Sequence, residues 1–317
     1  MENVKILKIP GWFIKLFAGW LFFLFVWGTY RILRRRSLNI RFKATLILAF
    51  LIYCLFKGKR ERIKRNVALI RPDLTEQQIS QYAWRIVRTI ARSWAAMLGN
   101  EFAALEEISR KLKAEGEIEQ ILSYHQTGKK TVATMVHVGP VDEMAGIIPL
   151  FGLNVYVPAE AMKPKWFFNL MMRLRLRFEG IIYDSVEKGQ TLLRAAQHLS
   201  DGHIVLLAVD LPRKSGNGVS CQIGKARAIF PVGAVKLALE QNATIFPVFP
   251  SWEEDWTVKV RIGEPFVLIR TGDMAQDIEI NTRRLIEEIY APHILENLDS
   301  WLRLPWNDLE QSPTDLM

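Results

Sequence analysis

The hydrophobic pattern divides the chain into an apolar amino-terminal part and a longer part in which short apolar runs alternate with amphipathic segments. The residues from Ile9 to Gly28 are apolar apart from Lys15. A helix of this length spans about 30 Å, the thickness of the hydrocarbon core of a bilayer. The segment therefore predicts a membrane helix, and because no small-residue cleavage site follows it, we expect it to be retained as an anchor.

Basic residues follow the predicted anchor, at Arg31, Arg34, Arg35, Arg36, Arg41 and Lys43. By the positive-inside rule, this cluster holds its end of the helix in the cytoplasm. A second apolar run, from Ala44 to Phe56, is short for a membrane span, so we expect it in the membrane interface or in the domain core. The pattern thus predicts an anchor with a basic flank over residues 1–43, single-pass or monotopic, and a cytoplasmic remainder.

A helical pattern extends from Arg60 to Phe102, with a break at the Arg71-Pro72-Asp73-Leu74 segment. Thr75 and Gln78 have the capping-box spacing at the start of the second helix. We place an interfacial and helical region at residues 44–130. We expect it to form one domain with the rest of the chain, over residues 44–317.

From Thr131 onward, β-branched runs alternate with amphipathic helices. Strands are expected at 131–136, 154–158, 181–183, 203–209 and 243–249, and helices at 165–177, 188–199, 231–241 and 279–296. Two later strands, at 257–262 and 266–269, are expected to add in antiparallel orientation. The alternation predicts an α/β catalytic region over 131–317, with a mostly parallel central sheet flanked by helices.

The candidate chemistry lies directly after the first of these strands, at His137. Gly139 and Pro140 are suited to begin a helix, which places Asp142 and Glu143 in its first turn. Ligands of open α/β sheets bind at the carboxyl ends of the strands, and a His followed five residues later by an Asp can act as a base and its orienting acid. The helix dipole alone also favours two acids here, and a lone His after a strand is usually a polar loop residue.

Composition changes this picture little. The net charge of +9 permits nucleic acid, anionic lipid or an acidic substrate as partner, but the basic residues flank apolar membrane-type segments and form no nucleic-acid-reading motif. Cys54 and Cys221 make neither a metal-ligand spacing nor a disulfide framework. We therefore expect a lipid partner, no nucleic acid, no metal and no cofactor.

Several segments occur in a fairly specific order over nearly the whole chain: Arg65-Asn66-Val67, Arg71-Pro72-Asp73-Leu74, the His-x4-Asp box from His137 to Asp142, a strand ending at Asp210, and the run from Gly224 to Phe249. In this order they resemble the bacterial late-step lipid A acyltransferases, the lauroyl and myristoyl transferase group of the lysophospholipid and glycerolipid acyltransferase superfamily.

The resemblance implies a glycerolipid acyltransferase-like fold at the bacterial inner membrane, and a role in lipopolysaccharide biosynthesis. The activity it implies is transfer of a fatty acyl group from acyl carrier protein or coenzyme A to a hydroxyl of a membrane glycolipid such as a lipid A precursor. His137 would be the general base and Asp142 its orienting acid, with Glu143 as the alternative acid. No Gly-x-Ser-x-Gly elbow is present, and Cys221 has no evident base partner.

The chain departs from the family where Tyr-Arg-Pro is usual, because it has Tyr156-Val157-Pro158 and so lacks a cation for phosphate or for the developing oxyanion. The expected substrate-binding residues, including possible replacements for that cation, are Asp210, Gly224, Lys225, Arg227, Lys163 and Arg173, with Lys165 as a further basic candidate. Asp210 could equally be an acid that bonds the following loop, and Gly224 could serve turn geometry alone.

Three alternatives stay open at this point. The apolar face of the helix at 165–177, with Trp166, Phe168 and Met171, either lines an acyl-chain path or belongs to the core. The acceptor could be another lipid, such as a lysophospholipid, a glycosylated phosphatidylinositol or an amine-bearing lipid. The missing cation at Val157 also permits a non-catalytic membrane-bound protein of the same fold.

Overall fold

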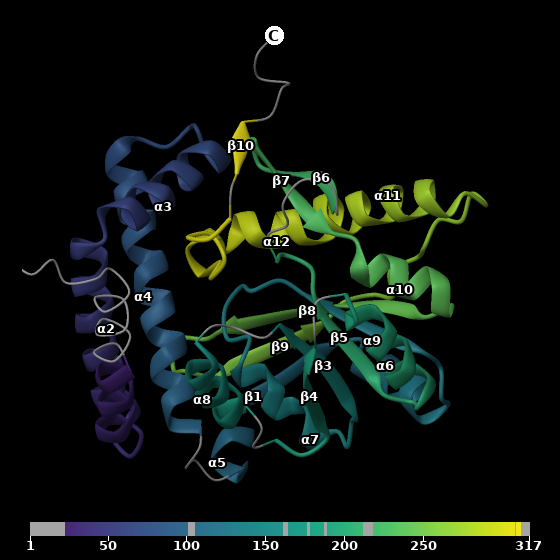
Figure 1. The fold of residues 1–317 in the computed structure, drawn as a ribbon, viewed down its shortest axis with the longest axis horizontal. Coiled ribbons are helices and arrows are strands. Elements are labelled where there is room, and N and C mark those ends of the chain that lie inside the picture. The colour runs from purple at the N-terminus through teal and green to yellow at the C-terminus, as the bar shows by residue number, and fades with distance from the viewer. Residues whose placement is uncertain are drawn as a thin grey trace, which may run out of the picture.

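A seven-stranded sheet occupies the centre of the computed structural model, which describes residues 23–100, 105–160, 164–175, 178–186, 189–211, 218–307 and 309–311 (Figure 1). Its strands are β1 (Leu112–Gly116), β2 (Thr131–Met135), β3 (Val155–Glu160), β4 (Ile181–Val186), β5 (Ile204–Ala208), β8 (Thr244–Trp252) and β9 (Val258–Ile262). They lie in the order β1-β9-β8-β2-β5-β3-β4.

The strands from β8 to β4 pair in parallel, while β9 runs antiparallel to β8 and carries β1 beside it. This confirms the predicted α/β fold with a mostly parallel sheet, and the antiparallel addition expected at 257–262. The second expected addition, at 266–269, is reduced to a single bridge between Phe266 and Ile245. Strand β1 was not predicted from the pattern.

Helices surround the sheet. The described ones are Phe23–Leu33, α2 (Leu38–Leu55), α3 (Lys57–Ile70), α4 (Glu76–Asn100), α5 (Leu105–Ser109), α6 (Ile118–Gln126), α7 (Ile147–Leu150), α8 (Lys165–Arg175), α9 (Thr191–Ser200), α10 (Gly233–Gln241), α11 (Met274–Arg284) and α12 (Ala291–Glu296). Two 3₁₀ turns, η1 (Glu143–Gly146) and η3 (Leu298–Ser300), and a π-helical turn, η2 (Leu285–Tyr290), complete the set.

Alternating side chains of the parallel strands build two separate cores, because successive residues of a strand point to opposite faces. Val132 and Val205 belong to the core that α3, α4, α9, α10, η2 and α12 cover. Ala133 and Met135 belong to the opposite core, which α6, η1 and α7 cover. Because both faces of the sheet are buried, its strand ends remain for binding, and ligands of open α/β sheets bind at the carboxyl ends of the strands.

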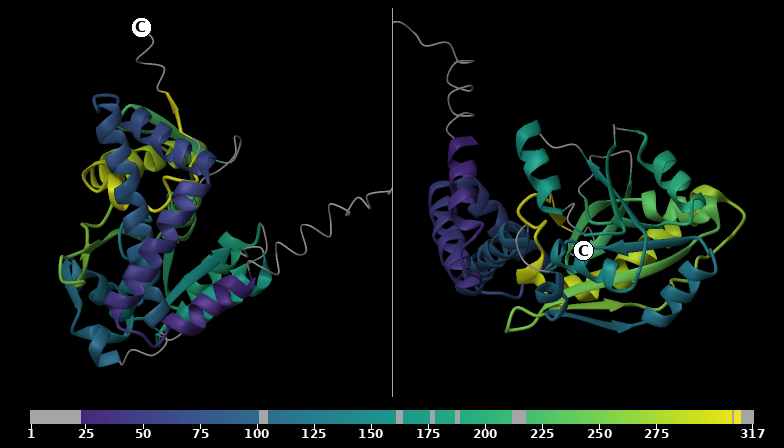
Figure 2. Two further views of the ribbon diagram at one scale, coloured as in Figure 1. Left: turned by 90° about the vertical axis from the view of Figure 1, so that its left-hand side faces the viewer. Right: turned by 90° about the horizontal axis from the view of Figure 1, so that it is seen from below.

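The amino-terminal helices lie outside this body. Helix α2 packs along the outer side of α4, which separates it from the sheet (Figures 1 and 2). Its one buried residue, Thr45, donates a hydrogen bond of 2.9 Å from Oγ1 to the carbonyl of Ala91 on α4. Most of the side chains that α2 leaves exposed are apolar, and the polar exceptions, Asn39 and Lys43, lie near its start. The large apolar ones are Ile40, Ile47, Phe50, Leu51, Ile52 and Leu55.

Helix α2 changes the predicted picture of the membrane anchor. Most of the predicted helix from Ile9 to Gly28 lies outside the described residues. Within them, Leu38–Leu55 is the one helix long and apolar enough to cross a membrane, with a mean hydropathy of 1.7. In the sequence, the apolar run is short for a membrane span because it begins at Ala44, after the charges at Arg41 and Lys43. In the structure Arg41 turns inward and donates from Nη1 to the carbonyl of Ala96, at 3.3 Å.

Helix α8 contributes to a third apolar cluster. Phe168 and Met171 are buried there with Tyr30 and Leu33 of the amino-terminal helix. This favours the core interpretation of the apolar face of α8.

A small antiparallel sheet, β10-β7-β6, lies above the main one in Figure 1. It comprises β6 (Gly218–Ile223), β7 (Ala226–Pro231) and β10 (Glu310–Gln311). The turn of the β6–β7 hairpin rests on the end of α3, where the backbone N–H of Lys225 donates to the carbonyl of Ile70 at 3.1 Å. Gly224 in this turn has a φ of +60°, and a Cβ there would lie 2.5 Å from the same carbonyl oxygen.

We predict that Gly224→Ala lowers the free energy of unfolding by at least about 2 kcal/mol, because it adds a steric clash with backbone to the cost of a left-handed conformation. Gly128→Ala is the matched control: Gly128 has a φ of +69° but open space around its Cα, so only the conformational cost of about 1 kcal/mol applies. Chemical denaturation of the detergent-solubilised protein measures both values, and equal losses would contradict the proposed packing against Ile70.

Candidate active site

Strand register brings His137 and Asp210 together. Met135 at the end of β2 is aligned with Ala208 at the end of β5, and the backbone N–H of Val209 donates to the carbonyl of Met135 at 2.9 Å. Two residues beyond the end of each strand, His137 and Asp210 leave the sheet side by side at the carboxyl ends of β2 and β5. Parallel neighbours with the same register thus deliver an imidazole and a carboxylate to one point.

Three donors hold the carboxylate of Asp210, which is only 1% exposed. The His137 ring bonds through Nδ1 to Oδ1 at 2.6 Å, and the backbone N–H of His137 donates to Oδ2 at 2.8 Å. The indole Nε1–H of Trp301 also donates to Oδ2, at 2.8 Å. The aspartate therefore fixes both the backbone and the ring of His137.

The carboxyl-terminal segment after η3 closes the other side of this pair. Trp301 is fully buried and forms an isolated bridge with Val138. The N–H of Leu302 donates to the His137 carbonyl at 2.8 Å, and the N–H of Gly139 donates to the carbonyl of Ser300 at 3.0 Å. The loop that carries His137 is consequently bonded to the segment that carries Trp301.

The electrostatics of the pair define its proton positions. Burial by itself would raise the pKa of Asp210, but the charge and hydrogen bonds of His137, together with the Trp301 hydrogen bond, outweigh burial and hold this pKa below its ordinary value. An ionised carboxylate only accepts hydrogen bonds, so Nδ1 of His137 carries the proton that joins the two residues. In the neutral ring, Nε2 is then an acceptor, and the side chain is 21% exposed. The arrangement can take a proton from a bound group.

The expected partner of His137 bonds elsewhere. Asp142 accepts a hydrogen bond of 2.6 Å from Nε of Arg175 on α8. The predicted helix does not begin at Pro140. Gly139 adopts a φ of +73°, and a Cβ at this position would lie 2.9 Å from the carbonyl oxygen of Pro250. Helical turns begin only at Glu143. The geometry that would have placed Asp142 against His137 is thus not formed, and its catalytic role remains a prediction.

Arg175 is a cation that the sequence reading missed. It lies in the last turn of α8, two residues after the candidate Arg173, and residues two apart point to different sides of a helix. Arg173 is exposed, whereas Arg175 reaches Asp142 on the loop of His137. Burial would lower the pKa of Arg175, but the charge of Asp142 opposes this and the pKa is raised.

The remaining substrate-binding candidates occupy other parts of the chain. Gly224 and Lys225 form the turn of the β6–β7 hairpin, and Arg227 lies in β7, aligned with Gln222 and Glu310. These positions belong to the small sheet and not to β2 or β5. Lys163 lies outside the described residues, and Lys165 is exposed at the start of α8.

The residue that sequence reasoning missed completely is Trp301. Its signal is faint, because Trp301 lies in a short segment of mixed polar and apolar residues, near Trp306, where no strand or helix period is evident. A buried indole N–H nevertheless requires an acceptor, and a strand-end carboxylate is the strongest kind.

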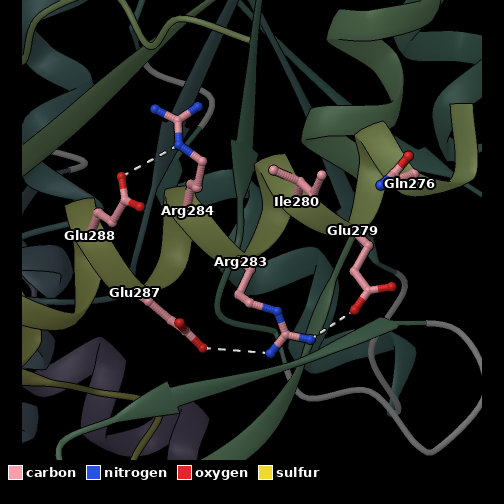
Figure 3. Close-up of a pocket in the computed structure, with 7 residues that line it drawn as sticks. All are labelled: Gln276, Glu279, Ile280, Arg283, Arg284, Glu287 and Glu288. Atoms are coloured by element: carbon pink, nitrogen blue, oxygen red, sulfur yellow. Dashed lines mark hydrogen bonds and ion pairs between the residues drawn. The ribbon is translucent and has the colours of Figure 1, made fainter. Parts of the chain in front are cut away.

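A groove of about 400 Å³ on the surface of α11 and η2 offers no comparable chemistry (Figure 3). Its charged side chains pair along the helix: Arg283 with Glu279 at 2.8 Å and with Glu287 at 3.8 Å, and Arg284 with Glu288 at 3.5 Å. Figure 3 shows these ion pairs as dashed lines, and within each pair the opposite charges compensate each other.

Comparison with known proteins identifies a family for the chain. Residues 13–304 match a family model described as bacterial lipid A biosynthesis acyltransferase. The match includes both strand ends that carry His137 and Asp210, and it extends past Trp301. A search of curated proteins gives no match.

Glu143, next to Asp142, is a buried acid whose protonation is expected to affect stability. Its side chain is buried, and neither carboxyl oxygen has a hydrogen-bond partner among the described residues. Burial, followed by the charge of Asp142, raises its pKa well above the ordinary value. A raised pKa means that the stability contribution is present below the unfolded pKa, about 4.3, and is lost as the pH rises toward the folded value.

We therefore predict that Glu143→Gln and the wild type are similarly stable near pH 4, and that the variant gains by up to about 1.4 kcal/mol per pH unit above it, until the folded pKa is reached. The exposed Glu254→Gln, on the loop after β8, is the control and should track the wild type. Denaturation at a series of pH values measures the difference, and a pH-independent offset would refute the buried-acid account.

Proposed function

Because the chain belongs to the bacterial lipid A biosynthesis acyltransferase family, we propose that it is a membrane-associated O-acyltransferase that acts on a glycolipid. The acyl donor is the thioester of acyl carrier protein or coenzyme A, and the acceptor is a hydroxyl of a membrane glycolipid such as a lipid A precursor. The family supports lipid acyl transfer in general. The 2.6 Å contact between His137 and Asp210 is the observation that carries the mechanism.

In the proposed reaction, Nε2 of neutral His137 accepts the proton of the acceptor hydroxyl as its oxygen attacks the thioester carbonyl carbon. A C–O bond forms and the C–S bond breaks, so the acyl group passes directly to the lipid. The departing thiolate takes the proton from the imidazolium and leaves as a thiol. The ring returns to its neutral state, and no acyl-enzyme or cofactor is required.

Asp210 is the orienting acid in this proposal. Its carboxylate keeps the proton of His137 on Nδ1, so that Nε2 faces the acceptor, and it stabilises the imidazolium that forms during attack. The hydrogen bond from Trp301 supports this role, because it keeps the carboxylate ionised and in place. The resemblance implied this role for Asp142, and we reassign it because Asp210 contacts the His137 ring whereas Asp142 bonds Arg175.

We assign to Arg175 the cationic role left open by Val157. Asp142 holds the guanidinium against the loop that carries His137. The nitrogens not bonded to Asp142 remain able to bind an acceptor phosphate or the oxyanion that develops on the thioester carbonyl.

The membrane placement follows from the same proposal. A lipid acceptor stays in the bilayer while the thioester donor arrives from solution, so the site has to lie at the surface. The apolar side chains that α2 leaves exposed suit contact with lipid. We place the sheet on the cytoplasmic face of the bacterial inner membrane, as the basic flank of the amino-terminal segment favours.

Two substitutions of equal size separate the roles of the acids. We predict that Asp210→Asn lowers kcat/KM roughly 100-fold or more, because an amide can donate to Nδ1 and hold the wrong tautomer. Asp142→Asn retains an acceptor for Arg175 and should cost less than about 10-fold. Purified variants are assayed for acyl transfer to a lipid A precursor from both thioester donors, with circular dichroism to verify folding.

His137→Ala is the reference for complete loss of the base, with an expected decrease of about 100- to 10,000-fold. If Asp142→Asn reached this level while Asp210→Asn stayed active, the orienting acid would be Asp142 and our assignment would be wrong.

Photo-crosslinking tests the membrane contact of α2. Ile47 on α2 is 62% exposed and Leu193 on α9 is 72% exposed, so the two positions present apolar side chains equally well. We expect a photoreactive amino acid at position 47 to capture phospholipid in intact membranes and one at position 193 to capture none. Equal yields at the two positions would contradict the placement of α2 in lipid.

A further inference from the structure

A second polar cluster lies at the opposite edge of the sheet, where α9 turns into β5. It consists of His198 near the end of α9, Asp201 in the turn, and His203 directly before the strand. One ligand atom from each of these side chains lies within 4.8 Å of the other two.

Neighbouring groups hold the two imidazoles in place. The His198 ring stacks on the ring of Tyr156 with centroids 3.9 Å apart, and the two histidine rings meet edge to face at 5.1 Å. Nδ1 of His203 lies 3.3 Å from the carbonyl of His198. A histidine whose one nitrogen bonds a backbone carbonyl presents its other nitrogen for a metal, which is the usual arrangement around bound zinc.

Some polar atoms of this cluster lack hydrogen-bond or ion-pair partners among the described residues. Nδ1 of His198 is buried and has no hydrogen-bond partner in the part of the chain that the structure describes. Within the described chain, the carboxylate of Asp201 makes no hydrogen bond to a side chain and no ion pair. The nearby cation, Arg194, lies 3.7 Å from Asp184, which satisfies part of its charge. Among the described residues, Nδ1 of His198 and the Asp201 carboxylate are therefore left without a compensating side chain.

We propose that His198, Asp201 and His203 bind one Zn²⁺ ion, which joins the end of α9 to the start of β5. Two imidazoles and one carboxylate suit zinc, whereas Mg²⁺ and Ca²⁺ prefer oxygen ligands alone. Tetrahedral zinc with bonds of about 2.0–2.1 Å separates its ligand atoms by roughly 3.3 Å. Rotation of the exposed Asp201 side chain, with small shifts of the two half-buried rings, closes the remaining gap, and water completes the coordination.

The ion has a structural role in this proposal, and it is independent of acyl transfer. His203 and Asp210 lie at the two ends of β5, and seven residues of extended chain span about 23 Å. A metal at the first position is too remote to contact a group bound at the second. The spacing of the three residues along the chain predicted no metal site, whereas their arrangement in the folded protein favours one.

Zinc binding is tested on the full-length protein in detergent micelles, with any affinity tag removed and metal stripped by a chelator. We expect titration with Zn²⁺ against a competing chromophoric chelator to show one site per chain. The melting temperature should rise by roughly 5 °C when free Zn²⁺ exceeds the Kd a hundredfold. His198→Ala and His203→Ala should each weaken binding at least about 10-fold and remove this rise.

His125→Ala is the matched control. The pKa of His125 on α6 is lowered mainly by burial and in part by the charge of His203, so the two residues are neighbours. His125 is not one of the three proposed ligands. This variant should bind Zn²⁺ as the wild type does. Unchanged binding in His198→Ala or His203→Ala, or loss of binding in His125→Ala alone, would overturn the proposal. Acyl transfer measured on the same samples should not depend on the metal.

Discussion

The buried carboxylate of Asp210 is the constraint on which the rest of the site depends. A charge that is 1% exposed is tolerated only with several donors, and this one has three: the ring and backbone of His137 and the indole of Trp301. Removing one donor leaves a buried charge less compensated and frees the group that it held. The Asp210 carboxylate therefore joins β2, β5 and the carboxyl-terminal segment. Its hydrogen bonds explain why the imidazole of His137 at a strand end is held in one orientation.

The register of the sheet makes this arrangement available. Because β2 and β5 are parallel neighbours, with Met135 opposite Ala208, their next polar residues leave the sheet at the same edge. The helical layer on one side and α6 with α7 on the other keep both faces apolar. The same edge also receives Asp142, on the loop of His137, and Arg175 from α8. The proposed base, its orienting acid and the proposed cation therefore come from three separate parts of the chain.

The sequence predicts the class of the fold and the position of the candidate base, because strand and helix periods and a polar residue at a strand end are local signals. It does not predict partners that depend on register. Asp142 is five residues from His137 along the chain, but a turn through Gly139 directs it to Arg175, while Asp210 arrives from 73 residues away. Helix α2 shows the same limit: it begins at Leu38 and includes Arg41 and Lys43, whereas the apolar run in the sequence begins only at Ala44. Only the fold shows that Arg41 donates to the carbonyl of Ala96 on α4.

The most direct test of acyl transfer by this site is mass spectrometry of membrane lipids from cells with and without the protein, beside a matched strain that carries His137→Ala. Our account predicts a lipid heavier by one acyl group that appears only with the unaltered protein, and its mass would identify acceptor and chain together. An acylated product other than a lipid A precursor would preserve the chemistry and change the acceptor. The same lipid profile in all three strains would contradict the account and favour a membrane-bound protein that keeps the fold without catalysis.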